Sequence, residues 1–375
     1  MGGDTNLKDK RIALSHDWLV TVGGGERCLS IFARLFPQAP IYTTIHRPEV
    51  TGGLVPPQRV RASFLDRLPE FLRRRHRHLL PLMPMAFESF KLRDVELILS
   101  SSHCAAKGIR KPQGAKHICF CYSPMRYVWD LYDDYVRGMR GVTRAAFTWA
   151  APRLRDWDKR TSGNVDVFIA ISGFIADRIR RIYNRNSVVV YPPVDCSAFT
   201  IDANIPRGEH FLILSRLVDY KRVDVAVDAF SKLPYKLRVA GSGPALDELK
   251  AKAGSNVEFA GFVPEERLAD EYRRARGVIV TALEDFGLVP VEAAACGTPS
   301  IALRAGGYLE TVREGVSGTF FPEQTPDSLR VALERFLKMG FDPIKVRETS
   351  LPFDTPRFER QIIDLASQTL GGLTT

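Results

Sequence analysis

The stretch Gly277-Val-Ile-Val-Thr-Ala-Leu-Glu284-Asp-Phe-Gly-Leu-Val-Pro-Val-Glu292 decides the fold class of this chain. Its apolar first half predicts a buried parallel strand, so that Glu284 would follow the carboxyl end of the strand. Residues 288–295 predict a helix. Pro290 falls in its first turn, where a proline is tolerated because the N–H group that it lacks would have no partner within the helix. A buried strand that leads through a short loop into a helix is typical of an open α/β sheet.

Two carboxylates would lie at this edge of the sheet. Glu292 stands eight positions after Glu284, just over one turn into the helix. Open α/β sheets bind ligands beyond the carboxyl ends of their strands, and a helix N-terminus there suits a phosphate. A carboxylate can accept hydrogen bonds from two hydroxyls, so the pattern predicts a sugar-nucleotide site with the backbone amides of Gly287 and Leu288 facing the diphosphate. In the alternative interpretation, both glutamates are solvated surface residues.

The same stretch, continued by Glu292-Ala-Ala-Ala-Cys-Gly-Thr-Pro, resembles the signature of the retaining GT-B glycosyltransferases of glycosyltransferase family 4. This family includes sucrose synthase and many bacterial polysaccharide mannosyltransferases. The resemblance implies that Glu284 contacts the donor sugar and Glu292 the nucleotide ribose. It also implies the α/β GT-B fold, in which two Rossmann-like β/α/β domains face each other across a cleft.

Length and composition agree with a two-domain globular protein. The chain has 375 residues, 45% of them hydrophobic and 26% charged. It lacks an apolar run long enough for a membrane span, and its first residues do not resemble a signal peptide, so we expect a cytoplasmic protein. The six cysteines show no metal-ligand spacing, and we expect them to be reduced.

Positive charge is concentrated in the first half of the chain. Residues 1–200 contain 31 Lys and Arg against 18 Asp and Glu, whereas residues 201–375 contain 22 against 25. This asymmetry predicts that the first domain meets an anionic partner.

Alternating strands and helices predict a first domain over residues 1–197 and a second over residues 208–350, with a C-terminal helix over 356–375 that crosses back to the first. The first domain opens with a strand at 11–15, a turn at 23–25 and a helix at 27–36. Further strands are predicted at 95–100, 117–122, 165–170, 187–191, 211–215, 236–240, 256–260, 278–281 and 300–303. Gly24 and Gly25 would let a donor approach the backbone at a helix start. Their spacing does not match the dinucleotide fingerprint.

Two cations follow the first strand of the second domain. Arg216 and Lys221 could neutralise a leaving diphosphate, the role that the resemblance implies for this spacing. Alternatively, they belong to a basic surface loop. The family uses such cations in place of a divalent metal, so the resemblance implies neither a metal nor another cofactor.

Two further segments bear on the nucleotide. The turn that contains Gly241 and Gly243 would either lie near the nucleotide or be a plain turn with no role in binding, and both interpretations remain open. The resemblance places the backbone around Val263 against the base. It leaves the identity of the base open.

The first domain is expected to bind the acceptor. Tyr122-Ser-Pro-Met-Arg-Tyr-Val-Trp-Asp130 follows a strand and resembles a motif of O-antigen-type mannosyltransferases, in which a histidine often replaces Tyr122. A phenol titrates near 10 rather than near 6.5, so the role of Tyr122 is open. His103, Arg126 and Asp130 are candidate acceptor contacts, although a lone histidine is more often structural.

Residues 64–85 combine apolar side chains at helical spacing with the basic run 73–78. This combination suits an anionic membrane surface. The alternative is a helix packed on the core with a solvated basic end. A glycan acceptor linked to polyprenyl diphosphate would explain both the charge and its confinement to the first domain.

The leading hypothesis is a metal-independent, retaining hexosyl transfer to a glycan or lipid-linked glycan in surface polysaccharide synthesis, at the cytoplasmic face of the membrane. The resemblance favours mannose from GDP-mannose over a UDP-sugar. One alternative is a nucleotide-sugar 2-epimerase of the same fold. Another is a non-catalytic basic module for membranes or nucleic acid, which leaves Arg216 and Lys221 unexplained. We therefore expect no nucleic-acid partner.

Overall fold

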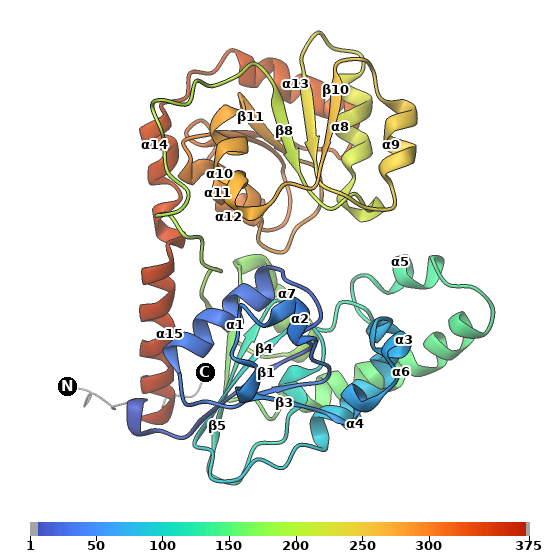
Figure 1. Ribbon diagram of the computed structural model, residues 1–375, viewed down its shortest axis with the longest axis vertical. Coiled ribbons are helices and arrows are strands. Elements are labelled where there is room, and N and C mark those ends of the chain that lie inside the picture. The colour runs from blue at the N-terminus through green and yellow to red at the C-terminus, as the bar shows by residue number, and fades with distance from the viewer. Residues whose placement is uncertain (1–6, 373–375) are drawn as a thin grey trace. The chain divides into compact units, whose positions relative to one another are not determined.

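The computed structural model describes residues 7–372, and backbone contacts divide the chain into two compact units (Figure 1). The N-terminal unit runs to Tyr191 and takes in the C-terminal segment from Glu359, and the C-terminal unit comprises Pro192–Phe358. Each unit is a parallel sheet flanked by helices, which confirms the prediction of two Rossmann-like α/β domains. The outermost parts of the predicted segments 1–197 and 356–375, residues 1–6 and 373–375, lie outside the described residues.

The sheet of the N-terminal unit has the strand order β3-β2-β1-β4-β5-β6-β7, and every neighbouring pair is parallel. The strands are β1 Ile12–His16, β2 Ile41–Thr43, β3 Val60–Ala62, β4 Leu97–Ser102, β5 Lys116–Cys121, β6 Val167–Ala170 and β7 Val188–Val189. The sequence did not predict β2 and β3, because three residues are too few to show a period. The strand order reverses between β1 and β4, where open α/β sheets bind ligands.

Helices of the N-terminal unit follow most of these strands. They are α1 Gly24–Leu35, α2 Pro48–Thr51, α3 Glu70–Arg73, α4 Met83–Glu88, α5 Tyr132–Arg137, α6 Gly141–Ser162 and α7 Gly173–Tyr183. The last helix, α15 Thr355–Leu370, begins in the C-terminal unit and continues into the N-terminal one, where Glu359 pairs with Arg34 of α1.

A buried ion pair fastens α6 to the core of the N-terminal unit. The Nζ of Lys107 lies 2.7 Å from one carboxylate oxygen of Asp158, and both side chains are almost inaccessible to solvent. The other oxygen of Asp158 accepts hydrogen bonds from the Trp129 indole and the Tyr183 hydroxyl, each 2.8 Å long. Buried charges persist only when they are paired and hydrogen-bonded. Trp129 of the predicted acceptor motif therefore has a structural role.

Residues 64–85 do not form the single helix that their apolar spacing suggested. Short 3-10 turns at Phe64–Arg67 and His76–Leu82 alternate with α3 and α4. Proline accounts for the breaks: Pro69 precedes α3, and Pro81 lies inside the second 3-10 turn, where it cannot donate a backbone hydrogen bond.

The sheet of the C-terminal unit has the order β10-β9-β8-β11-β12-β13, again with all neighbours parallel. Its strands are β8 Phe211–Leu214, β9 Leu237–Ala240, β10 Val257–Gly261, β11 Gly277–Val280, β12 Ser300–Leu303 and β13 Gly318–Phe321, the last of which the sequence did not predict. Its helices are α8 Val223–Phe230, α9 Leu246–Lys252, α10 Glu265–Arg274, α11 Leu288–Ala295, α12 Tyr308–Thr311, α13 Pro326–Leu337 and α14 Pro343–Glu348. The strand order reverses between β8 and β11.

The helix predicted at 288–295 is confirmed as α11, and a tight backbone contact holds the loop before it. The amide of Gly307 donates to the carbonyl of Glu284 over 2.9 Å. A Cβ on Gly306 would lie 2.3 Å from that carbonyl oxygen, and a Cβ on Gly307 would lie 2.3 Å from the Cα of Phe286. Only glycines permit this approach, which fixes the path of the chain between β11 and α11.

We predict that Gly307→Ala loosens this loop. Overpacking a close contact costs about 1–3 kcal/mol, so the C-terminal unit should melt at a lower temperature in calorimetry. Hydrogen exchange of the amides between β11 and α11 should accelerate. Gly340→Ala is the matched control, because no atom lies within 4 Å of the position that a Cβ would take there. Equal effects of the two substitutions would contradict the proposed constraint.

Candidate functional site

The structure brings Lys221 and Glu284 together where the strand order of the C-terminal unit reverses. Lys221 follows β8, Glu284 follows β11, and the Lys221 ammonium pairs with the Glu284 carboxylate. The hydroxyl of Thr281 donates to the backbone carbonyl of Lys221 over 3.0 Å, which anchors one loop to the other. Arg216 lies on the loop of Lys221, but its exposed guanidinium bonds to the hydroxyl of Tyr220. Two cations and a carboxylate thus cluster at one sheet edge.

The second carboxylate and the start of α11 lie at the same edge. Glu292 accepts a 2.6 Å hydrogen bond from the hydroxyl of Tyr272 in α10, which orients its carboxylate. Gly287, at the N-cap of α11, has a φ of 92° and, as a glycine, has no side chain to cap the helix. The first amides of α11, beginning with Leu288, therefore remain available to an anion.

The predicted glycine turn has a packing role. A Cβ on Gly241 would lie 1.8 Å from the carbonyl oxygen of Ser215, and one on Gly243 would lie 2.2 Å from that of Leu217. The turn after β9 thus packs directly on the loop that carries Arg216. Val263 is half-buried and follows β10 at the same edge.

Sequence reasoning missed residues that shape this site from a distance. Tyr272 orients Glu292, and Gly306 and Gly307 fix the backbone at Glu284. Burial raises the pKa of the neighbouring Tyr308 well above 10, and the charge of Glu284 adds to this effect. The adjacent glycines after β12 were a readable signal of close backbone approach, whereas nothing in the sequence links Tyr272 to Glu292.

In the N-terminal unit, the reversal point between β1 and β4 carries another acid–base pair. Asp17 follows β1 and is completely buried, and its carboxylate lies 2.9 Å from Nδ1 of His103, which follows β4. Backbone amides of residues 103–106 donate to the same carboxylate over 2.6–3.0 Å. Burial alone would raise the pKa of Asp17, but His103 and these amides lower it to about 2.

The hydroxyl of Tyr122 forms hydrogen bonds with residues of the same unit. It donates to the carbonyl of Gly25 and contacts the hydroxyl of Ser101, each over 3.0 Å. Desolvation of the phenol raises its pKa well above 10. Gly24 is the first residue of α1, and a Cβ on Gly25 would meet only ordinary contacts at 3.6 Å. Packing therefore does not explain the glycine at position 25.

The other two predicted acceptor residues lie further along the same motif. Asp130 pairs with Arg178 and Arg181 of α7, each over 2.8 Å. Its carboxylate is thus engaged by the protein itself. Arg126 is half-buried.

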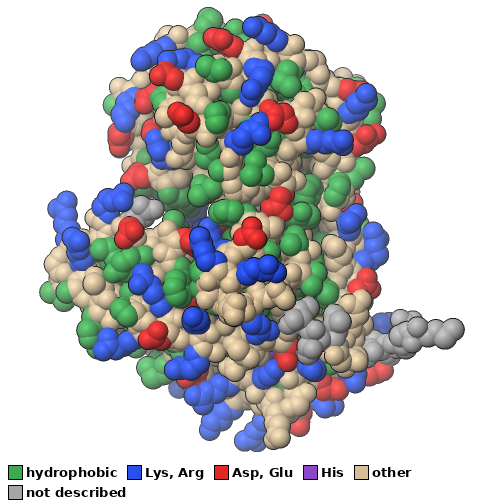
Figure 2. All heavy atoms as spheres, turned by 180° about the vertical axis from the view of Figure 1, so that it is seen from behind, with side chains coloured by type: hydrophobic (Ala, Val, Ile, Leu, Met, Phe, Trp, Pro, Cys, Tyr) green, Lys and Arg blue, Asp and Glu red, His purple; other side chains and the backbone are tan. Residues whose placement is uncertain are grey.

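Residues 64–85 expose both apolar and basic side chains. Phe71 is 65% exposed and Met85 55%, while Leu79, Leu80 and Met83 are buried in the core. Arg74, Arg75 and Arg77 are exposed. On the face shown in Figure 2, Lys and Arg side chains are spread over the N-terminal unit, in the lower part of the view.

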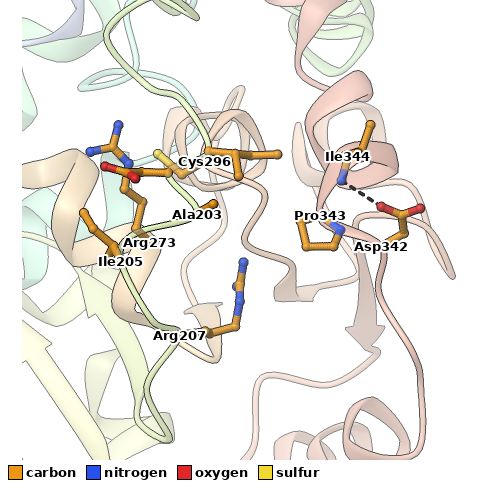
Figure 3. Close-up of a pocket in the computed structure, with 10 residues that line it drawn as sticks. Ala203, Ile205, Arg207, Arg273, Cys296, Asp342, Pro343 and Ile344 are labelled. Atoms are coloured by element: carbon orange, nitrogen blue, oxygen red, sulfur yellow. Dashed lines mark hydrogen bonds between the residues drawn. The ribbon is translucent and has the colours of Figure 1, made fainter.

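A separate cavity of about 390 Å³ lies in the C-terminal unit. It is lined by Ile201, Asp202, Ala203, Ile205, Arg207, Arg273, Cys296, Asp342, Pro343 and Ile344 (Figure 3). Several of these residues precede β8, β11 or β12, so the cavity lies toward the amino ends of the strands. It contains none of the predicted site residues.

All six cysteines are buried and unbridged. Within residues 7–372, no group of three or more His, Cys, Asp and Glu side chains could hold a metal ion. In the same part of the chain, no helix is both long and apolar enough to cross a membrane.

Two family models match most of the chain. The model described as Glycosyltransferase Family 4 matches residues 22–198, and the model described as Glycosyl transferases group 1 matches residues 202–349. Among curated relatives, D-inositol 3-phosphate glycosyltransferase of Acidothermus cellulolyticus is 30% identical over 56% of this chain and 51% of its own. A GDP-mannose-dependent α-(1-6)-phosphatidylinositol dimannoside mannosyltransferase of Mycobacterium tuberculosis is 28% identical over 50% and 54%. The chain spans about half the length of these relatives.

A solved structure shares the fold over nearly the whole chain. Sucrose-phosphate synthase from Thermosynechococcus elongatus superposes with a TM-score of 0.70 at 20% identity and covers 97% of this chain and 100% of its own. This likeness shows the GT-B fold. The two family models, which together match most of the chain, show that it belongs to the glycosyltransferases of family 4.

Proposed function

We propose that this protein transfers a hexose from a nucleotide sugar to a hydroxyl group of a glycan, with retention of the anomeric configuration. The observation that carries the proposal is the set of Arg216, Lys221 and Glu284 at the reversal point of the C-terminal sheet, at the edge where α11 begins after Gly287. Cations and helix amides suit a diphosphate, and carboxylates suit sugar hydroxyls.

In the proposed reaction, the acceptor oxygen bonds to the anomeric carbon while the bond from that carbon to the diphosphate oxygen breaks. The acceptor proton passes to the departing phosphate on the same sugar face, so no separate base is needed. Arg216, Lys221 and the amides of Gly287 and Leu288 would stabilise the growing negative charge. Glu284 would position the sugar and oppose its positive charge. Its contact with Lys221 would then loosen when the diphosphate engages the ammonium.

GDP-mannose is the proposed donor. Its support is the GDP-mannose-dependent mycobacterial relative, together with the motif from Tyr122 to Asp130. The competing donor is a UDP-sugar, since an Anabaena HepE structure with UDP has a TM-score of 0.68. Parallel calorimetric titrations with GDP, UDP and ADP distinguish the bases, and tighter binding of UDP than of GDP would overturn the choice.

The proposed acceptor is a glycan linked to polyprenyl diphosphate at the cytoplasmic membrane face. Exposed apolar and basic side chains alternate over residues 64–85, which suits contact with anionic lipid. The fold also hosts nucleotide-sugar 2-epimerases. Incubation of the protein with GDP-mannose and with UDP-sugars, with and without such an acceptor, separates the two activities, because an epimerase needs no acceptor.

Glu292→Ala should weaken nucleotide binding. A hydrogen bond to a charged group contributes roughly 1.5–3 kcal/mol, so GDP affinity should fall by about one to two decades in calorimetry. Glu334→Ala is the control, since Glu334 is exposed on α13 away from this edge. Wild-type affinity in Glu292→Ala would remove the assigned ribose contact.

Replacement of Arg216 or Lys221 by Ala should lower turnover more than donor affinity, because the leaving-group charge grows toward the transition state. We expect a loss of kcat of about 100-fold, the scale of removing one donor to a developing anion. Lys250→Ala, at an exposed site on α9, should be silent. Activity should also persist in EDTA, and strict dependence on added magnesium or manganese would contradict the metal-independent mechanism.

Charge reversal of Arg73, Arg74, Arg75 and Arg77 to Glu should release the protein from anionic vesicles, since each basic side chain near the surface adds about 1 kcal/mol. Co-sedimentation measures this, and salt should weaken it in the wild type. The matched control reverses four exposed lysines of the C-terminal unit, Lys232, Lys236, Lys250 and Lys252. If both variants lose binding equally, or if the wild type fails to sediment at low salt, residues 64–85 are not the attachment site.

A further inference from the structure

The hydroxyl of Tyr122, the most obvious polar group of its motif, is already engaged by the protein. It donates its hydrogen to the carbonyl of Gly25 and is also bonded to Ser101. Ser101 in turn lies 3.1 Å from Nδ1 of His16. The single hydrogen of the phenol is thus already used within this network. A sugar could accept it only if the hydrogen bond to the Gly25 carbonyl were broken.

His103 is the neighbouring polar ring, 6.4 Å from Tyr122 between ring centroids. Its orientation is set from behind by Asp17, whose carboxylate lies 2.9 Å from Nδ1. Four backbone amides also bind this carboxylate and lock its position. The Trp18 ring holds the imidazole from the side in an edge-on contact, with centroids 4.6 Å apart. The ring therefore has little freedom to turn.

This arrangement fixes which ring nitrogen carries the hydrogen. The carboxylate of Asp17 lies 2.9 Å from Nδ1, and a carboxylate accepts hydrogen bonds, so Nδ1 donates to it. Nε2 is then the ring nitrogen that is left for a ligand. No described residue hydrogen-bonds to Nε2, and the side chain is 23% exposed. The structure thus presents a preoriented ring nitrogen to solvent.

The place of this atom in the fold matters. Asp17 follows β1 and His103 follows β4, the two strands between which the sheet order reverses. Ligands of open α/β sheets bind in the crevice outside such a point. The start of α1, with Gly24 and Gly25, lies at the same edge, and a Cβ on Gly25 would touch the rings of His16 and Tyr122.

We propose that His103 is an acceptor-binding residue, whose Nε2 forms a hydrogen bond with an acceptor-sugar hydroxyl other than the attacking one, and that Asp17 is its positioning residue. This inference rests on the proposed glycosyl transfer. The attacking hydroxyl keeps its own hydrogen for the departing phosphate. His103 therefore contributes to acceptor affinity and leaves the nucleotide-binding residues of the C-terminal unit unaffected.

Two substitutions at position 103 separate the roles of the two ring nitrogens. His103→Asn retains an amide donor near the place of Nδ1 but has no polar atom at the place of Nε2. His103→Gln carries an amide group that can reach the place of Nε2 and can donate or accept there. His210→Asn is the matched control, because His210 is a half-buried histidine that precedes β8 at the opposite sheet edge of the other unit. Asp17→Asn is less informative alone, since an amide opposes the backbone donors and destabilises the fold.

The measurements are acceptor KM and kcat at saturating donor, and GDP affinity by calorimetry. All four tryptophans lie in the N-terminal unit, so their fluorescence reports whether that unit is folded. We expect His103→Asn to raise acceptor KM about tenfold or more with unchanged GDP affinity, and His103→Gln to recover most of the loss. His210→Asn should match the wild type.

An acceptor KM within twofold of the wild type in a folded His103→Asn variant would overturn the inference about His103 and leave the proposed function standing. Equal losses in the Asn and Gln variants, or a parallel loss of GDP affinity, would also overturn it, because either result points to a structural role. If the wild type transfers sugar from no nucleotide donor to any glycan, the proposed function fails, and the inference fails with it.

Discussion

The close contact between the turn at Gly306 and Gly307 and the loop after β11 is the constraint on which the C-terminal site depends. The loop must leave the strand, present Glu284 and enter α11 within a few residues. A hydrogen bond from Gly307 to the Glu284 carbonyl fixes that path, and side chains on either glycine would collide with it. The carboxylates and the helix amides therefore keep one relative geometry, which a binding site for a flexible diphosphate requires.

Both units carry an acid–base pair where their strand order reverses. In the C-terminal unit, Lys221 after β8 meets Glu284 after β11, and in the N-terminal unit, Asp17 after β1 meets His103 after β4. The pairs differ in burial, and this difference sets their chemistry. Asp17 is completely buried and its carboxylate accepts hydrogen bonds from backbone amides, so its role is limited to orienting His103. Both members of the C-terminal pair are partly exposed, so a ligand can compete for each charge.

The sequence was informative where a feature is local. The strand before Glu284 and the helix after it follow from a few consecutive residues, and the structure confirms both. Short strands such as β2 and β3 gave no periodic signal, and the apolar spacing of residues 64–85 concealed breaks at Pro69 and Pro81. The pairing of Asp17 with residues 103–106 was invisible, because contacts across 86 or more positions depend on the folded sheet.

The basic surplus of the first half is only partly available to a partner. Arg59 donates to the carbonyls of Ala33, Phe36 and Ala39 around the end of α1, and Arg185 donates to those of Ser162 and Val165 beyond α6. Cations at helix ends complement the helix dipole and satisfy carbonyls that the helix leaves unbonded. These arginines count in the composition but present little charge to solvent. The charge that an anionic surface could meet lies in exposed side chains, among them Arg75 and Arg77 in the segment that also exposes Phe71. Composition predicts an anionic partner for this half of the chain, and the structure separates the exposed basic side chains from those that backbone carbonyls already engage.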